Sequence, residues 1–306
     1  MIDLPENGLI AATFTNLTRE GELNLEGIDD YASYLHDRKV IAVMVGGTTG
    51  EFTSLTTHER IALTGAWRKA VKDEFAIIAH ASHTCQEDAR QMAAAYHRAE
   101  VDAIALAAPY FFYPNKAQQL VEFFKPIMAA APETPFYYYY LPSLIPAPVP
   151  LEQFLEAADE GLPQLMGVKY THNDIAELSR LQKRFAGRFS FNFGCDEMYL
   201  QGLQAGATRA IGSTYNFLAD DFHKVAQTYS EGDLAEAEAL QTMLTTQIDA
   251  IVDAGPFPLS GLKAMMKTVG IDCGPVRQPL ASISEPQFDA LLIQLEGIRQ
   301  NWPLSI

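Results

Sequence analysis

The sequence predicts an α/β protein of the (β/α)8 TIM-barrel class with a C-terminal helical appendage. Short apolar runs alternate with longer amphipathic stretches eight times, as is typical of a parallel sheet whose strands are joined by helices. Eight strand–helix pairs also close such a sheet into a barrel. A doubly wound open sheet would show the same alternation. We favour the barrel because the chemically distinctive residues follow apolar runs, and active sites of barrels lie at the carboxyl ends of the strands.

Each strand is expected from an apolar run and each helix from the amphipathic stretch that follows it. The predicted strands are, in chain order, Leu9–Phe14, Val40–Val45, Phe75–Ala79, Ala103–Ala108, Phe136–Leu141, Leu165–Val168, Phe189–Phe193 and Ala210–Ile211. The predicted helices are Leu25–Arg38, Thr57–Val71, Cys85–Arg98, Ala117–Ala130, Leu151–Ala158, Asp174–Phe185, Glu197–Ala205 and Ala219–Tyr229.

After Tyr229 the alternation stops. Three further stretches have a helical pattern and are separated by Gly-Pro pairs; they are Leu234–Ala254, Leu259–Val269 and Glu285–Asn301. We therefore predict a catalytic barrel over residues 1–230 and a helical segment packed on it over residues 231–306.

Composition excludes several classes of partner. The formal net charge of −16 argues against binding to nucleic acid or to an anionic membrane. No apolar run approaches the ~20 residues that span a bilayer, and the first residues resemble no export signal. Cys85, Cys195 and Cys273 are far apart and form no CxxC pair, so we expect reduced thiols in a cytoplasmic protein.

One lysine occupies a position suited to chemistry. Lys169 follows the apolar run Leu165–Val168, so its side chain should point into the mouth of the barrel. Partial desolvation disfavours the ammonium form, and a free amine can attack a ketone to form a Schiff base. A lysine that pairs with an acid or extends to solvent is the structural alternative.

Four other segments lie at the carboxyl ends of predicted strands. Gly46–Glu51, with the sequence GGTTGE, offers backbone amides and two hydroxyls to an anion, and no Walker lysine follows it. Tyr137–Pro142, with the sequence YYYYLP, offers a phenol as a proton relay, although three of its four tyrosines are interpreted as packing. Gly194–Glu197 and Ala210–Asn216 bring carboxylates and a serine that suit a polyhydroxylated substrate.

In series, GGTTGE, YxxP, GVKxT and GSTYN resemble the N-acetylneuraminate lyase / dihydrodipicolinate synthase family, and the resemblance extends from Gly8 to about Pro279. It implies that Lys169 forms the Schiff base with a 2-oxo acid and that Tyr139 relays protons beside the imine. Thr48 and Thr49 would hold the substrate carboxylate. The residues implied to contact the hydroxyls of the sugar chain are Thr171, Gly194, Asp196, Glu197 and Ser213.

The lyase branch of the family implies a specific reaction. The expected chemistry is reversible cleavage of N-acetylneuraminate to pyruvate and N-acetylmannosamine, with a small-molecule substrate and without a metal or an organic cofactor. The resemblance also implies a homotetramer. Two alternatives remain: an aldolase or dehydratase of the same family with another sugar-derived 2-oxo acid, and a non-catalytic barrel that senses pyruvate or a sugar acid.

The sequence departs from the family at three places. Leu144 stands where the synthase branch has an arginine that binds the aldehyde substrate, which argues against dihydrodipicolinate synthase. Phe111 stands where many relatives have a tyrosine that relays protons across a subunit interface. The segment Gly255–Gly261 is longer than the corresponding turn and could reshape the rim of the pocket.

Two histidines follow the third predicted strand. His80 and His83 resemble half of a metal site, but the sequence offers no third ligand at a suitable spacing. Imine chemistry needs no metal, so no metal site is predicted.

Overall fold

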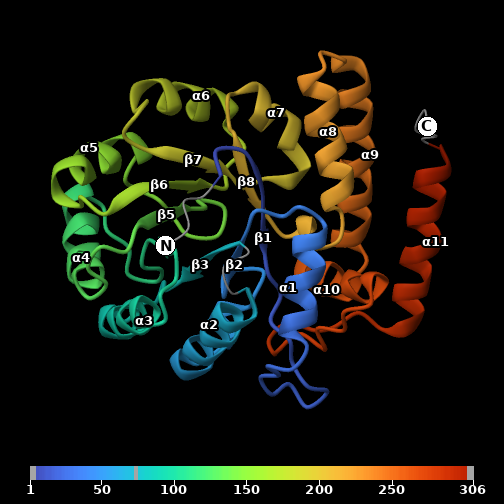
Figure 1. The fold of residues 1–306 in the computed structure, drawn as a ribbon, viewed down its shortest axis with the longest axis horizontal. Coiled ribbons are helices and arrows are strands. Elements are labelled where there is room, and N and C mark those ends of the chain that lie inside the picture. Colours follow the sequence, from blue (N-terminus) through green and yellow to red (C-terminus); the bar gives the residue numbers. More distant parts are fainter. Residues whose placement is uncertain (1–4, 72–74, 302–306) are drawn as a thin grey trace.

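A computed structural model describes residues 5–71 and 75–301 of the chain. Eight parallel strands pair in sequence order, and β8 pairs with β1 to close the barrel (Figure 1). The predicted fold class is confirmed. The strands are β1 (Gly8–Ala12), β2 (Ala42–Val45), β3 (Ala76–His80), β4 (Ala103–Ala107), β5 (Phe136–Tyr140), β6 (Leu165–Tyr170), β7 (Ser190–Phe193) and β8 (Arg209–Gly212).

Helices surround the barrel and cover the outer faces of the strands (Figure 1). They are α1 (Ile28–Asp37), α2 (Thr57–Val71), α3 (Gln86–Arg98), α4 (Ala117–Ala129), α5 (Leu151–Gly161), α6 (Ile175–Arg184), α7 (Tyr199–Gln204) and α8 (Ala219–Ser230). Short 3-10 turns precede α2, α7 and α8; they are η1 (Phe52–Ser54), η2 (Asp196–Met198) and η3 (Thr214–Asn216).

Local backbone geometry explains why two helices have other bounds than the sequence predicted. The helix predicted from Leu25 begins at Ile28, because Gly27 before it takes a left-handed conformation with φ of 76°. The helix predicted over Glu197–Ala205 is divided into the turn η2 and the helix α7, since helices often begin with a tighter 3-10 turn.

Strand β6, which carries the predicted reactive lysine, is held closely to its neighbours. Lys169 pairs in register with Tyr139 of β5 and with Asn192 of β7. A Cβ on Gly167 would lie 2.2 Å from the carbonyl oxygen of Ser190, so only glycine permits this approach of β6 to β7. The position of Lys169 is thus fixed by backbone pairing on both sides.

The C-terminal helices lie beside α8 and the last strands. They are α9 (Leu234–Asp253), α10 (Pro258–Ala264), the 3-10 turn η4 (Met265–Val269) and α11 (Glu285–Asn301) (Figure 1). Leu240 and Leu244 of α9 belong to the same apolar core as the barrel strands. A smaller apolar cluster joins α9 to α11 through Ile251, Leu291 and Leu295.

The boundary between a barrel and an appendage at residue 230 stays a prediction, and residues 1–4 and 302–306 of the two predicted ranges lie outside the described residues. None of the helices in the described ranges is both long enough and apolar enough to cross a membrane.

Candidate active site

A cavity of about 510 Å³ opens at the carboxyl ends of the strands. Every residue for which the sequence predicted a role at the site lines it: Thr48, Thr49, Tyr139, Lys169, Thr171, Gly194, Asp196, Glu197 and Ser213. These residues come from loops and strands that are far apart in the chain and converge because the barrel closes. That these residues line the cavity does not test their chemical roles, which stay predictions.

Lys169 is buried and has no carboxylate partner. Its exposed fraction is 5%, and its Nζ lies 3.6 Å from Sδ of Met44 and 4.2 Å from the centroid of the Tyr139 ring. No ion pair joins it to any residue in the described ranges. The contacts of Lys169 therefore match neither structural alternative, an acid-paired lysine or a solvent-directed one.

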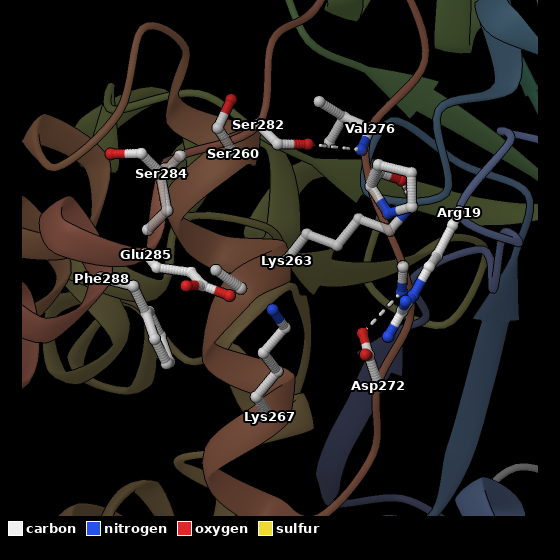
Figure 2. A pocket seen from close by; sticks show the side chains of 14 residues that line it. Arg19, Ser260, Lys263, Lys267, Asp272, Val276, Ser282, Ser284, Glu285 and Phe288 are labelled. Atoms are coloured by element: carbon white, nitrogen blue, oxygen red, sulfur yellow. Dashed lines mark hydrogen bonds between the residues drawn. The ribbon is translucent and has the colours of Figure 1, made fainter.

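A second buried lysine, Lys263, has the partners that Lys169 lacks. Lys263 of α10 is 2% exposed and lines a different cavity (Figure 2). Its Nζ donates to Oε1 of Glu51 at 2.7 Å and to the carbonyl oxygen of Pro275 at 2.6 Å. The charge of Lys263 is thus paired with a carboxylate, as burial of a charge ordinarily requires, whereas Lys169 has no such partner.

Tyr139 faces the amine from the neighbouring strand. Its hydroxyl lies 3.2 Å from Oγ1 of Thr48, and its ring meets the ring of His80 edge-on at 5.8 Å. Tyr138 and Tyr140 alternate to the outer face of β5 and contact aromatic side chains there. Strand alternation therefore gives the hydroxyl of Tyr139, rather than those of its two neighbours, access to the cavity.

The loop after β2 presents hydroxyls and backbone to the cavity. Gly46 takes φ of 67°, and its carbonyl accepts a hydrogen bond from Nδ1 of His80 at 3.0 Å. Burial, together with the charge of Arg60, keeps the pKa of His80 well below its usual value, so the imidazole is neutral. Oγ1 of Thr49 lies 2.9 Å from Oγ of Ser213, which ties this loop to the loop after β8.

The opposite side of the cavity carries a buried carboxylate. Oδ2 of Asp196 accepts hydrogen bonds from the backbone N of Thr214 at 2.9 Å and from its hydroxyl at 2.6 Å. Burial raises the pKa of Asp196, and the hydrogen bonds from Thr214 oppose that shift. A Cβ on Gly212 would lie 1.7 Å from Oδ1 of Asp196, so this glycine makes room for the carboxylate.

Two buried oxygens at this end have no hydrogen-bond partner among residues 5–71 and 75–301: Oδ1 of Asp196 and Oγ1 of Thr171. A buried polar atom without a partner is costly, so such atoms mark places where a ligand or water completes the structure. Glycine at position 194 also matters here, since a Cβ there would lie 2.1 Å from Oγ1 of Thr171.

The C-terminal helices contribute residues that the sequence did not predict. Asp249 and Val252 of α9 and Leu259 of α10 line the same cavity. Burial raises the pKa of Glu197, and the negative charges of Asp196 and Asp249 add to that shift. Nothing in the pattern of α9 distinguished Asp249 from other exposed acids, because its place depends on how α9 packs against the barrel.

Two residues that depart from the family pattern, Leu144 and Phe111, are exposed. Leu144 lines the cavity with 65% of its surface exposed, so this position offers no positive charge to a second substrate carboxylate. Phe111 and Phe112 are 80% and 85% exposed, and Phe111 takes φ of 79°, which is uncommon for a bulky residue.

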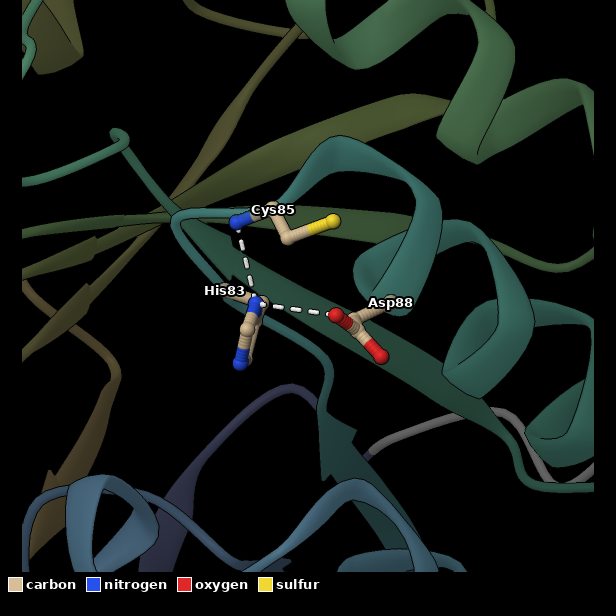
Figure 3. A group of neighbouring side chains, drawn as sticks. All are labelled: His83, Cys85 and Asp88. Carbon is tan, nitrogen blue, oxygen red and sulfur yellow. Dashed lines mark hydrogen bonds and ion pairs between the residues drawn. The ribbon is translucent and has the colours of Figure 1, made fainter.

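The two histidines considered as a metal pair are in different environments. Both ring nitrogens of the buried His80 already have partners, Gly46 and Ser82. His83 instead lies beside Cys85 and Asp88 at the start of α3, with one ligand atom of each within 4.8 Å of the others (Figure 3). In the sequence these three residues have the spacing His-x-Cys-x-x-Asp. The sequence-based prediction considered His83 only together with His80 and did not consider this group. Nδ1 of His83 accepts a hydrogen bond from the backbone N of Cys85 at 2.9 Å.

Fold and site together define a (β/α)8 barrel with an unpaired buried amine and a phenol at the mouth. The chain belongs to the dihydrodipicolinate synthetase family, whose model matches residues 5–296. It is 34% identical over 284 residues to N-acetylneuraminate lyase of Rattus norvegicus, covering 91% of this chain and 88% of the relative.

Solved structures give the same relationship. N-acetylneuraminate lyase of Proteus mirabilis superposes with a TM-score of 0.91 at 30% identity, covering 95% of this chain and 98% of that chain. The sialic acid aldolase of Aliivibrio salmonicida has the same TM-score and identity, covering 95% and 96%.

Proposed function

We propose that this protein is a Schiff-base (class I) aldolase that reversibly cleaves N-acetylneuraminate to pyruvate and N-acetylmannosamine. The observation that carries the proposal is the buried amine of Lys169, without an ion-pair partner, beside the phenol of Tyr139 in an open cavity. The names of the relatives, which match nearly full length, support the choice of substrate.

In the proposed reaction, the amine of Lys169 attacks the C2 ketone, and loss of water leaves an iminium ion. The iminium accepts the electron pair of the C3–C4 bond as that bond breaks, while the C4 hydroxyl gives up its proton. Tyr139, whose ring centroid lies 4.2 Å from Nζ, is proposed to relay that proton: its oxygen accepts the proton while its own hydrogen passes to the substrate carboxylate. The resulting enamine takes a proton at C3, and water releases pyruvate and regenerates Lys169.

The two ends of the cavity suit the two ends of such a substrate. The hydroxyls of Thr48 and Thr49, with the backbone of their glycine-rich loop, are the proposed carboxylate donors. The unpartnered oxygens of Thr171 and Asp196 are the proposed contacts for the hydroxyls of the sugar chain. Glu197, Ser213 and the backbone at Gly194 would complete this polar wall.

The test of the proposed function is release of pyruvate from N-acetylneuraminate by the purified chain, run beside Lys169→Ala. Saturable release that the variant lacks supports the proposal. Equal release by the variant, or none by either protein, overturns it.

A second candidate is an aldolase for a different sugar-derived 2-oxo acid. It is favoured by Pro258 and Leu259, which lie in the wall of the cavity and belong to the segment Gly255–Gly261 that the sequence analysis expects to be longer than in the lyases. A panel of sugar acids decides between the two: the leading proposal requires the highest kcat/KM for N-acetylneuraminate. Dihydrodipicolinate synthase is disfavoured by Leu144, which replaces the expected arginine with an apolar side chain.

We also propose that the chain works as a cytoplasmic homotetramer. The exposed aromatic rings of Phe111 and Phe112 support a self-association surface, since adjacent large apolar side chains are rarely left in water. The three cysteines, all free thiols, suit a reducing compartment. Sedimentation velocity tests the assembly: a purely monomeric species at micromolar concentration would contradict it.

A further inference from the structure

Helix α9 follows the last strand–helix pair of the barrel, yet it forms part of the wall of the candidate active site. Figure 1 shows this helix beside α8, outside the ring of strands. Ile248, Asp249 and Val252 of α9 line the cavity. The first and the last of these are apolar, so Asp249 is the polar side chain that α9 presents to a substrate.

Hydrogen bonds from the two preceding turns of α9 fix the place of Asp249. Nε2 of Gln241 donates to the carbonyl oxygen of Asp196 at 3.2 Å. Oγ1 of Thr245 donates to the carbonyl oxygen of Glu197 at 2.9 Å. Gln241, Thr245 and Asp249 follow each other at four-residue spacing, so they share one face of the helix. The two hydrogen bonds therefore hold this face of α9 against the segment after β7, which carries two of the proposed substrate contacts.

The three carboxylates that line the cavity differ in depth. Asp196, directly after β7, has 7% of its surface exposed, whereas Asp249 on α9 is exposed to solvent. Burial raises the pKa of Glu197, and the negative charges of Asp196 and Asp249 raise it further, so Glu197 lies close to both. The carboxylates thus run from the buried end of the cavity to its opening, and Asp249 is the outermost of them.

The negative charge at the outer end of the cavity has no cation to compensate it. Among the lining residues that the structure describes, Lys169 is the only cation, and it is buried at the inner end beside Tyr139. Neither Glu197 nor Asp249 forms an ion pair with any residue of the described ranges. An ionised carboxylate only accepts hydrogen bonds, so this end of the cavity suits hydrogen-bond donors and repels a second negative charge.

The position of Lys169 decides which part of a substrate reaches this outer end. In the proposed reaction, C2 of the substrate is bonded to the buried Nζ of Lys169. The carbons most distant from C2 then lie toward the opening of the cavity, and in a sugar acid they carry the terminal hydroxyls of the chain. Each hydroxyl can donate one hydrogen bond, and a carboxylate acceptor makes that bond stronger than a neutral acceptor does.

We propose that Asp249 is a specificity-determining residue, which together with Glu197 binds the terminal hydroxyls of the substrate chain and rejects a chain that ends in an anionic group. This inference rests on the proposed aldolase function and narrows its substrate class to 2-oxo sugar acids with an uncharged, hydroxylated tail. Lys169 and Tyr139 act on the bond that breaks, whereas Asp249 acts on which chain is bound. Its effect is therefore measured by comparing substrates that differ only at the tail.

The test compares N-acetylneuraminate with its 9-phosphate ester, which has the same chain but ends in a phosphate. The value of kcat/KM for pyruvate release is measured for both substrates at constant ionic strength, because salt screens the repulsion between charges. The proteins are the wild type, Asp249→Asn, Asp249→Lys and Asp253→Asn. The last is the matched control, since it removes the same charge from an exposed residue one turn further along α9 that does not line the cavity.

We expect the wild type and Asp253→Asn to prefer N-acetylneuraminate by at least about tenfold, because like charges brought together oppose binding. Asp249→Asn should lower kcat/KM for N-acetylneuraminate about fivefold, since a hydrogen bond to a charged acceptor becomes one to a neutral acceptor. The same variant should raise kcat/KM for the phosphate ester, and Asp249→Lys should raise it further.

Two results would overturn the inference: a wild type that cleaves both substrates equally well, or a preference that Asp249→Asn leaves unchanged or changes no more than Asp253→Asn does. A wild type that releases no pyruvate from either substrate overturns the proposed function itself, and the inference with it.

Discussion

Lys169 and Lys263 are both almost fully buried, but only Lys263 has an acid to pair with. An amine that a carboxylate holds in an ion pair is not free to attack a ketone, whereas an amine without such a partner is. Met44 and the face of Tyr139 surround Lys169 with weak partners rather than with an anion. This surrounding is the physical basis for proposing that Lys169, and not Lys263, is the nucleophile.

Tyr139→Phe separates proton transfer from imine formation. The ring, its packing against His80 and the contact with the amine all remain, and only the hydroxyl bonded to Thr48 is lost. We expect kcat for cleavage to fall by about 10²–10⁴, the usual contribution of a general acid–base group, while the pyruvyl adduct still forms. Steady-state kinetics and adduct mass spectrometry measure the two effects. Tyr138→Phe is the matched control, and an unchanged kcat in Tyr139→Phe would remove this residue from the mechanism.

Thr171→Val tests the sugar end of the cavity. The hydroxyl of Thr171 has no hydrogen-bond partner in the part of the chain that the structure describes, so its replacement by a methyl group should not lower the free energy of unfolding. Loss of one hydrogen bond to substrate predicts a KM for N-acetylneuraminate about 5–10-fold higher. Adduct formation with pyruvate alone should be unaffected. A variant that loses adduct formation as well would show that Thr171 shapes the amine's surroundings rather than the sugar site.

At the residue scale, the sequence predicted which strand-end residues line the cavity, because the carboxyl ends of barrel strands converge; their chemical roles stay predictions. It did not predict Asp249, nor Lys263 as the buried partner of Glu51. Both lie on C-terminal helices, whose placement over the mouth is decided by packing that has no periodic signature.

One buried ion pair, between Glu51 and Lys263, connects the loop Gly46–Glu51 to helix α10. Lys263→Met leaves the charge of Glu51 buried without its partner and should cost about 3–5 kcal/mol in the free energy of unfolding. Glu51→Gln/Lys263→Met removes both charges and should recover part of that loss. Urea unfolding measures both, with the exposed Lys267→Met as control. A double variant no more stable than Lys263→Met would contradict the role assigned to the pair.

Glu59 joins helix α2 to the loop between η4 and α11, which carries Arg277. This carboxylate accepts from the backbone N of Thr56 in a capping box and from both terminal nitrogens of Arg277. The hydrogen bonds with Arg277 lower the pKa of Glu59 to about 2. Because the folded-state pKa is depressed, the stabilisation is complete above about pH 4.5 and is lost as the pH falls toward 2.

Glu59→Gln should therefore lower stability by about 1.5 kcal/mol at pH 7, the lower end for hydrogen bonds to a charged group, because the pair is partly exposed. The difference from wild type should disappear as the pH approaches 2. Urea midpoints across this range check the prediction, and a difference that is independent of pH would show that charge is not the cause.

At the element scale, every predicted strand and helix has a counterpart, since the period of apolar residues changes clearly between strands and helices. The ends differ where single backbone conformations decide them, as Gly27 does for α1. The separation of Leu259–Val269 into α10 and η4 follows no change in pattern and was not predicted.

At the scale of the whole molecule, the C-terminal helices share the core of the barrel and complete its mouth. Lys169, Tyr139 and the substrate loop come from the barrel, whereas Asp249 and Leu259 close the cavity from outside it. The same helices reach the substrate loop through the ion pair of Lys263 with Glu51. The segment over residues 231–301 thus contacts the active-site region at two places, whereas the sequence predicted only that it packs on the barrel.

Covalent capture of pyruvate tests the central claim most directly. The chain is incubated with pyruvate and borohydride, and peptide mass spectrometry locates the reduced adduct in the wild type, in Lys169→Ala and in Lys263→Arg. The account predicts one adduct, on Lys169, in the wild type and in Lys263→Arg, and none in Lys169→Ala. An adduct on another residue, or an unmodified wild type, would contradict it.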